Sequence, residues 1–160
     1  MRTLSLLTLA GATLALTACN PFHRDPVTEV SRDVNVNSRW NASLVTPVAL
    51  AGAVQMNGSA SMQPGSKNDV TALSLNIANA TPGGLHPWQV HRGQCGANGS
   101  VFGTNASYRA MKIDDDGRGS ATATISERTP TWGDYSVVVF ASAANPETVV
   151  ACGNLAPPAR

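Results

Sequence analysis

The chain has 160 residues, of which 42% are hydrophobic, 5% aromatic and 13% charged. This length supports one domain, or one domain with a tail, and excludes large multidomain machinery. Lysine and arginine number 11 against 10 acidic residues. The balanced charge, without a basic cluster, argues against nucleic acid or an anionic lipid surface as an electrostatic partner, because both require concentrated positive charge.

The first residues have the pattern of an export signal. Arg2 supplies a short positive start, and residues 4–16 are apolar but too few to span a bilayer as a permanent helix. The stretch ends in Leu16-Thr17-Ala18-Cys19, which resembles the lipobox of bacterial lipoproteins. The resemblance implies that residues 1–18 are a lipoprotein signal peptide and that Cys19 becomes the acylated N-terminus, with palmitate-type chains. The alternative is an ordinary cleaved signal in which Cys19 is incidental.

A multiply acylated Cys19 implies an exported protein whose membrane partner is bound through its N-terminal acyl chains. Asn20, which follows the cysteine, is compatible with sorting to the outer membrane of a bacterial envelope, facing the periplasm. With Cys19 acylated, an even pair of cysteines remains, and we expect Cys95 and Cys152 to form a disulfide in this oxidising compartment.

Residues 19–47 are expected to be a lipidated N-terminus and tether. This segment contains three prolines and scattered charges, and it lacks a sustained hydrophobic period. The alternative for its end is that Trp40, Leu44 and Val45 form a first strand against the domain that follows.

Residues 48–160 are expected to form an all-β domain. Short strand candidates alternate with strong turn signals, and no stretch has a long helical period, so an antiparallel sandwich or barrel is predicted. Asp114-Asp115-Asp116-Gly117 predicts a hairpin turn, and the apolar run around Val138 predicts a strand covered on both faces. The strand candidates are residues 53–62, 70–78, 85–92, 108–113, 120–125, 135–141 and 149–154.

The segment Gly84-Leu85-His86-Pro87-Trp88-Gln89-Val90-His91 resembles the Cu,Zn superoxide dismutase family, which has Gly-Leu-His, two residues, and then His-x-His. The similarity continues, in the family's order, over about a hundred residues. It passes through Cys95, Asp115-Asp116-Gly117, Val137-Val138-Val139 and Val150-Ala151-Cys152-Gly153-Asn154. The resemblance implies a Greek-key β-barrel or sandwich in which Cys95 is bridged to Cys152.

The family's functional residues are mostly replaced in this chain. His86 matches a structural histidine and His91 matches one copper ligand, whereas two further copper-ligand positions fall on Gln89 and Phe140. Strand alternation places Gln89 and His91 on one side and His86 on the other. The resemblance therefore implies no catalytic residues and no cofactor, with His91 a weak, vestigial metal contact at most, because one imidazole holds copper weakly.

The loops that complete the family's site are altered as well. The segment 96–107, where the bridging histidine and the zinc ligands belong, contains no His and no Asp. Val149 stands where the family has the arginine that guides superoxide. The connection from Phe140 to Cys152 is too short for the family's charged guiding loop.

Several other residues have more than one interpretation. Met56 and Met62 share a strand face, where they fill the core or hold Cu(I). Residues 114–116 form a solvated turn or a calcium site, although a lone acidic hairpin lacks the required ligand count. Trp88 and Trp132 are core aromatics or exposed contact residues, and exposure favours partner binding.

The leading hypothesis is an exported, lipid-anchored superoxide dismutase-like domain that is not an enzyme. It acts as an envelope binding or structural protein, with an unidentified protein or envelope ligand as partner and homodimer formation left open. One alternative is a copper-binding or chaperone-like module that uses His91 and Gln89. Another is a residual superoxide dismutase, which has to recruit His23 from the tether.

Overall fold

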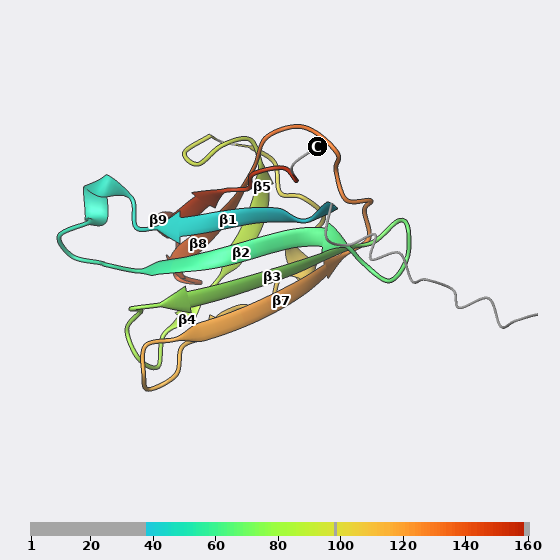
Figure 1. Cartoon of the computed structure of the whole chain (residues 1–160). Helices are drawn as coiled ribbons and strands as arrows, with labels where there is room; N and C mark the ends of the chain where they lie inside the picture. Colours follow the sequence, from blue (N-terminus) through green and yellow to red (C-terminus); the bar gives the residue numbers. More distant parts are fainter. Residues whose placement is uncertain (1–37, 98, 159–160) are drawn as a thin grey trace, which may run out of the picture. The chain divides into compact units, whose positions relative to one another are not determined.

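The computed structural model describes residues 38–97 and 99–158, so Cys19, His23 and the expected signal peptide lie outside the described residues. The described residues form an antiparallel, all-β domain whose main sheet curls into a half-barrel (Figure 1). All-β architecture was predicted and is confirmed. The elements are β1 (Trp40–Val45), η2 (Val48–Leu50), β2 (Asn57–Pro64), β3 (Thr71–Ala78), β4 (Leu85–His86), β5 (Trp88–Arg92), η3 (Asn105–Ser107), β6 (Met111–Lys112), β7 (Gly119–Ile125), β8 (Tyr135–Ser142) and β9 (Asn145–Asn154).

Seven strands form one sheet in the order β5-β8-β9-β1-β2-β3-β7, and β4 pairs with β6 in a separate two-stranded sheet. Strands β1, β2 and β3 follow one another directly, and β8 and β9 form a second hairpin. The connection from β3 to β5 and the connection from β7 to β8 both cross between distant positions in the sheet.

The core lies on the inner face of the curled sheet and follows the predicted alternation. In β3, Thr71, Leu73, Leu75 and Ile77 are buried, whereas the intervening residues are more exposed. Strand β8 is buried on both faces: Val137 and Val139 belong to the core cluster, and Val138, which is 8% exposed, lies outside it. Burial on both faces explains the continuous apolar run.

Residues 40–45 belong to the domain and not to the tether. They form β1, which pairs with β2 over six residue pairs from Trp40↔Met62 to Val45↔Asn57. Trp40 is fully buried, and its indole Nε1 donates a hydrogen bond to the Pro130 carbonyl at 3.0 Å. The boundary expected between residues 47 and 48 is therefore too late in the chain, because the burial of Trp40 ties this segment to the core.

The predicted strand over residues 108–113 is shorter than expected, and its partner is β4. Only Met111–Lys112 pairs as β6. The two preceding residues make loop contacts instead: the Tyr108 hydroxyl donates to the Phe102 carbonyl at 2.6 Å, and the Trp88 indole donates to the Arg109 carbonyl at 2.9 Å. These bonds hold the segment where it cannot extend a ladder with β7.

Candidate functional site

Strand β5 sends its side chains alternately to the two faces of the sheet. Trp88 and Val90 are each 1% exposed and belong to the core. Gln89 and His91 are half-buried on the other face. This alternation is the one that strand geometry predicts.

Strand β8 brings Phe140 to the same place. The register pairs Gln89 with Val138 and His91 with Ser136, and Phe140 follows Val138 by two residues on the same face. The ring of Phe140 lies 6.2 Å from the His91 ring, centroid to centroid, at an interplanar angle of 57°. The three positions singled out in the sequence therefore converge.

Hydrogen bonds tie these side chains to one another and to the loop that follows β5. His91 Nδ1 lies 2.9 Å from the Gly99 carbonyl oxygen, and His91 Nε2 lies 3.0 Å from Gln89 Oε1. Gln89 Nε2 in turn donates to Asn105 Oδ1 at 3.2 Å. We call Gln89, His91, Asn105 and Phe140 the His91 cluster.

Both ring nitrogens of His91 are engaged within the protein. The Gly99 carbonyl only accepts hydrogen bonds, so Nδ1 carries a proton. If the ring is an imidazolium, Nε2 donates a hydrogen bond to Gln89 Oε1. If the ring is neutral, Nε2 accepts a hydrogen bond from the Gln89 amide nitrogen, with the carboxamide rotated by 180°. The orientation of the carboxamide is assigned from the hydrogen-bond network. In either state, a metal ion at Nε2 must displace Gln89.

The donor set of the His91 cluster does not fit copper. It offers one imidazole and the carboxamides of Gln89 and Asn105, and Phe140 contributes only hydrocarbon. Redox copper sites draw on several imidazole or sulfur ligands. Across residues 38–97 and 99–158, no group of three or more His, Cys, Asp or Glu side chains is arranged to hold a metal ion.

His86 meets the His91 cluster only at the main chain of Phe140. It is 9% exposed, and its Nδ1 donates to the Phe140 main-chain carbonyl at 3.0 Å, so it links β4 to β8. Its Nε2 is buried without a hydrogen-bond partner among the described residues. A Cβ on Gly84 would lie 2.8 Å from this Nε2, so a side chain at position 84 would displace the imidazole. Both histidines therefore contact Phe140, His86 through the main-chain carbonyl and His91 through the ring.

A disulfide holds the loop beside the His91 cluster, as predicted from the cysteine count. Cys95 and Cys152 are bonded, with a Cα–Cα distance of 6.0 Å and a sequence separation of 57. The Cys95 amide also donates to Asn154 Oδ1 at 2.7 Å. The connection between β8 and β9 is a tight turn, because Ser142 already pairs with Asn145.

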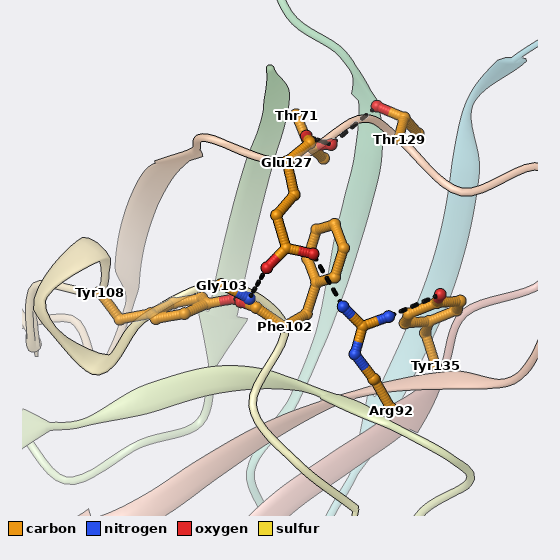
Figure 2. Close-up of polar contacts among 8 residues, drawn as sticks. All are labelled: Thr71, Arg92, Phe102, Gly103, Tyr108, Glu127, Thr129 and Tyr135. Atoms are coloured by element: carbon orange, nitrogen blue, oxygen red, sulfur yellow. Dashed lines mark hydrogen bonds and ion pairs between the residues drawn. The ribbon is translucent and has the colours of Figure 1, made fainter. Parts of the chain in front are cut away.

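A polar network at the end of β5 was not predicted from the sequence (Figure 2). Arg92 forms an ion pair with Glu127 at 2.7 Å and donates to the Tyr135 hydroxyl at 3.2 Å. Its guanidinium lies over the Phe102 ring, 5.2 Å from the centroid. The other Glu127 carboxylate oxygen accepts from the Gly103 amide at 3.1 Å. The network anchors the loop after Phe102 to β5.

The same network reaches β3 and Tyr108. The Thr71 hydroxyl donates to the Glu127 main-chain carbonyl at 2.7 Å and lies 2.9 Å from the Thr129 hydroxyl. Burial, assisted by the negative charge of Glu127, raises the pKa of Tyr108 to about 12 despite a backbone hydrogen bond and Arg92, which act in the opposite direction. Only tertiary contacts bring these residues together, and no local motif indicates them.

The structure also distinguishes between the two interpretations of several residues. Met56 and Met62 are 3% and 0% exposed and lie in the core cluster. Trp88 is a core residue, whereas Trp132 is 78% exposed. In the acidic turn, Asp114 Oδ1 accepts from the amides of Asp116 and Arg118, at 3.0 and 2.8 Å. That carboxylate therefore serves the turn itself.

In comparisons with known proteins, no protein-family model and no curated protein matches this chain. Within the part of the chain that the structure describes, no helix is long and apolar enough to cross a membrane.

Proposed function

We propose that this protein is a lipid-anchored component of a bacterial envelope, built on a superoxide dismutase-like Greek-key domain that has lost its metal sites. It binds a protein or another envelope ligand and does not catalyse dismutation. The observation that carries the proposal is the His91 cluster. The positions of the family's copper ligands meet there, yet they hold one histidine with both ring nitrogens engaged, one glutamine and one phenylalanine.

The topology supports the Greek-key part of this proposal. Three consecutive strands, β1 to β3, lie side by side, and β7 joins them at β3. The β8–β9 hairpin returns across the domain to lie next to β1. In a Greek key, a strand returns by a long connection to lie beside the first of three consecutive strands, and β9 lies beside β1 in this way.

Two contacts support the likeness to the dismutase family. The imidazole of His86, which matches the family's structural histidine, is bonded to the carbonyl of Phe140, which occupies a copper-ligand position. The disulfide joins the two cysteines that match the family's pair. Both contacts join motifs that are far apart in the sequence and that each resemble a motif of the dismutase family.

The lipid anchor comes from the lipobox-like sequence that ends at Cys19. Acylation there holds the domain at a membrane surface through a tether that ends before Trp40. Mass spectrometry of the membrane fraction tests this part alone: we expect an N-terminal acylated Cys19, and a Cys19→Ser variant should appear in the soluble fraction. An unmodified N-terminus upstream of Cys19 would contradict the anchor.

Copper titration of the purified, oxidised protein tests the loss of the metal site. We expect no tight copper binding and no superoxide turnover in the wild type. The double variant Gln89→His/Phe140→His restores two imidazoles beside His91, and we expect it to gain copper affinity. If the wild type binds one copper ion tightly and turns over superoxide, the proposal is wrong.

The variant His91→Ala separates this proposal from a copper chaperone. A chaperone that uses His91 and Gln89 should show weak copper binding that disappears in His91→Ala. We expect the two proteins to show the same residual binding. The matched control is His86→Ala, which removes an imidazole of the same chemistry outside the cluster.

A further inference from the structure

The loop that connects β1 to β2, residues 46–56, is apolar and exposed, and we call it the β1–β2 loop. Residues 40–66 contain no Asp, Glu, Lys, Arg or His. Of the large hydrophobic side chains that are exposed in the described part of the chain, two lie in this loop or directly before it: Val48 is 94% exposed and Val45 is 62% exposed. Figure 1 shows the loop, with η2, projecting beyond the ends of β1 and β2.

The domain supports the β1–β2 loop at its base. Met56 is 3% exposed and lies in the core cluster, and Leu50 and Val54 are partly buried and pack against that cluster. The Thr46 hydroxyl donates to the Met56 carbonyl at 3.1 Å and so joins the two ends of the loop. Between these anchors, Val48 and the alanines at positions 49, 51 and 53 are exposed. The loop therefore presents aliphatic side chains from a supported base.

The backbone of the loop forms hydrogen bonds within the loop itself. The Leu50 amide donates to the Pro47 carbonyl at 2.9 Å, and the Ala51 amide donates to the Val48 carbonyl at 3.2 Å. The amides of residues 53 and 54 both donate to the Leu50 carbonyl at 2.9 Å. Unpaired amides are costly in an apolar environment. Each of these bonds therefore lowers the cost of moving the loop out of water.

We propose that the β1–β2 loop inserts its tip, at Val48, into the interface of the membrane to which Cys19 is anchored. This inference rests on the lipid anchor of the proposed function. Residues 20–37 separate Cys19 from the described chain, and a segment of this length spans at most about 60 Å. Strand β1 adds only about 20 Å between Trp40 and the loop, at about 3.3 Å per residue. The loop is therefore within reach of the anchored membrane.

The side chains of the tip favour lipid over a protein groove. Protein interfaces draw on aromatic residues and arginine as anchors, and residues 46–54 contain none of these. They also contain no carboxamide or charged group to orient a partner. Insertion into lipid needs only apolar area. Without basic residues, the loop has no preference for anionic lipid, so the surface it fits is zwitterionic.

The tether makes a small inserted area sufficient. Insertion of one short loop is weak by itself, because its strength scales with the apolar area that leaves water. Anchoring through Cys19 makes the contact intramolecular and raises the effective concentration of the membrane surface around the loop. The loop therefore sets the orientation of the domain, whereas the acyl chains supply the attachment.

A fluorescent label at position 48 tests the inference in the acylated, full-length protein on phosphatidylcholine vesicles. In this protein the Cys19 thiol is acylated and Cys95 is bonded to Cys152, so an environment-sensitive fluorophore reacts with the new thiol of Val48→Cys. We expect the emission of this label to shift to the blue and to be quenched by brominated lipid. A label that stays in water on vesicle-bound protein, the result expected for a loop that binds a protein instead, would overturn the proposal.

The matched control is Lys67→Cys. Lys67 is exposed in the connection between β2 and β3. This connection lies near the start of β1, because Trp40 pairs with Met62, whereas Val48 follows the end of β1. We expect a label at position 67 to remain in water. Equal quenching of the two labels would contradict an orientation set by the loop.

A titration without the anchor separates the loop from the proposed function. The variant Cys19→Ser has no acyl chains, and we expect it to bind phosphatidylcholine vesicles weakly and independently of salt. Adding Val48→Asp, at an exposed position that leaves the fold intact, should weaken this binding by about tenfold or more, because a charge is costly to move into an apolar phase. Adding Lys67→Asp should not. If Cys19 proves not to be acylated, the anchor fails and this titration still decides the loop: equal binding with and without Val48→Asp overturns it.

Discussion

Both nitrogens of the His91 imidazole are hydrogen-bonded inside the protein. Gln89 holds one of them and Gly99 the other. A metal ion therefore competes with existing contacts at a site that supplies one strong donor. The chemistry of a single side chain thus depends on two neighbours that hold it in place.

Tyr108 provides a prediction about pH. Its phenol is neutral in both the folded and the unfolded chain below its ordinary pKa of 10, and burial raises the folded value to about 12. The unfolded state therefore ionises first, and stability is lost as the pH rises from about 10 towards 12. We expect Tyr108→Phe to lose less stability than the wild type over this window, as measured by urea unfolding at pH 9 and pH 11.

At pH 7 the same variant lacks the hydrogen bond to the Phe102 carbonyl, so it should be less stable than the wild type by about 1 kcal/mol. The change in unfolding free energy between pH 9 and pH 11 therefore separates ionisation of Tyr108 from loss of the hydrogen bond. An equal alkaline loss in both proteins would show that Tyr108 is not the group responsible.

Gly117 provides a prediction about the acidic turn. Its φ is +74°, and a Cβ at this position would lie 2.7 Å from the Ala80 carbonyl oxygen. We expect Gly117→Ala to cost about 1–3 kcal/mol, because it combines backbone strain with a close contact. Gly52→Ala is the matched control, since nothing lies within 4 Å of a Cβ there. Thermal unfolding compares the two, and similar melting temperatures would contradict the account.

The loop after β5 depends on the disulfide and on the Arg92–Glu127 network. The disulfide closes a segment with a sequence separation of 57. On the chain-entropy model this constraint is worth about 4 kcal/mol. We expect the double variant Cys95→Ala/Cys152→Ala to lose stability of that order in urea unfolding. Wild type treated with reductant should behave in the same way, and an unchanged midpoint in both would show that the bond does not constrain the unfolded chain.

Much of the strand pattern could be predicted because each strand carries its own signal. The alternation in β3 and the double-sided burial of β8 follow from the order of apolar and polar residues alone. The shortened β6 could not be predicted in this way, because Tyr108 and the Arg109 carbonyl are held by Phe102 and Trp88, which local sequence does not reveal.

In the candidate site, too, some features follow from the local sequence and others from tertiary contacts. Strand parity predicted that Gln89 and His91 share a face, and both are half-buried on β5, between the buried Trp88 and Val90. His86 was expected on the opposite face of the same strand, but it lies in β4, which pairs with β6 in a separate sheet. The engagement of His91 Nδ1 by the Gly99 carbonyl and the pairing of Arg92 with Glu127 were not predictable. Both depend on how loops return to β5, which is a property of the tertiary structure.

For the whole molecule, we propose a lipid anchor at Cys19 and a dismutase-like domain without a metal centre. The two proposals fail independently, because copper binding does not depend on the anchor.

Anomalous diffraction from crystals soaked in copper and zinc salts shows directly whether this domain has lost its metal centre. We predict no ordered metal bound by three or more side chains of this chain, and in particular none among Gln89, His91 and Phe140. A fully occupied copper or zinc peak held by three or more donors of the polypeptide would contradict the account.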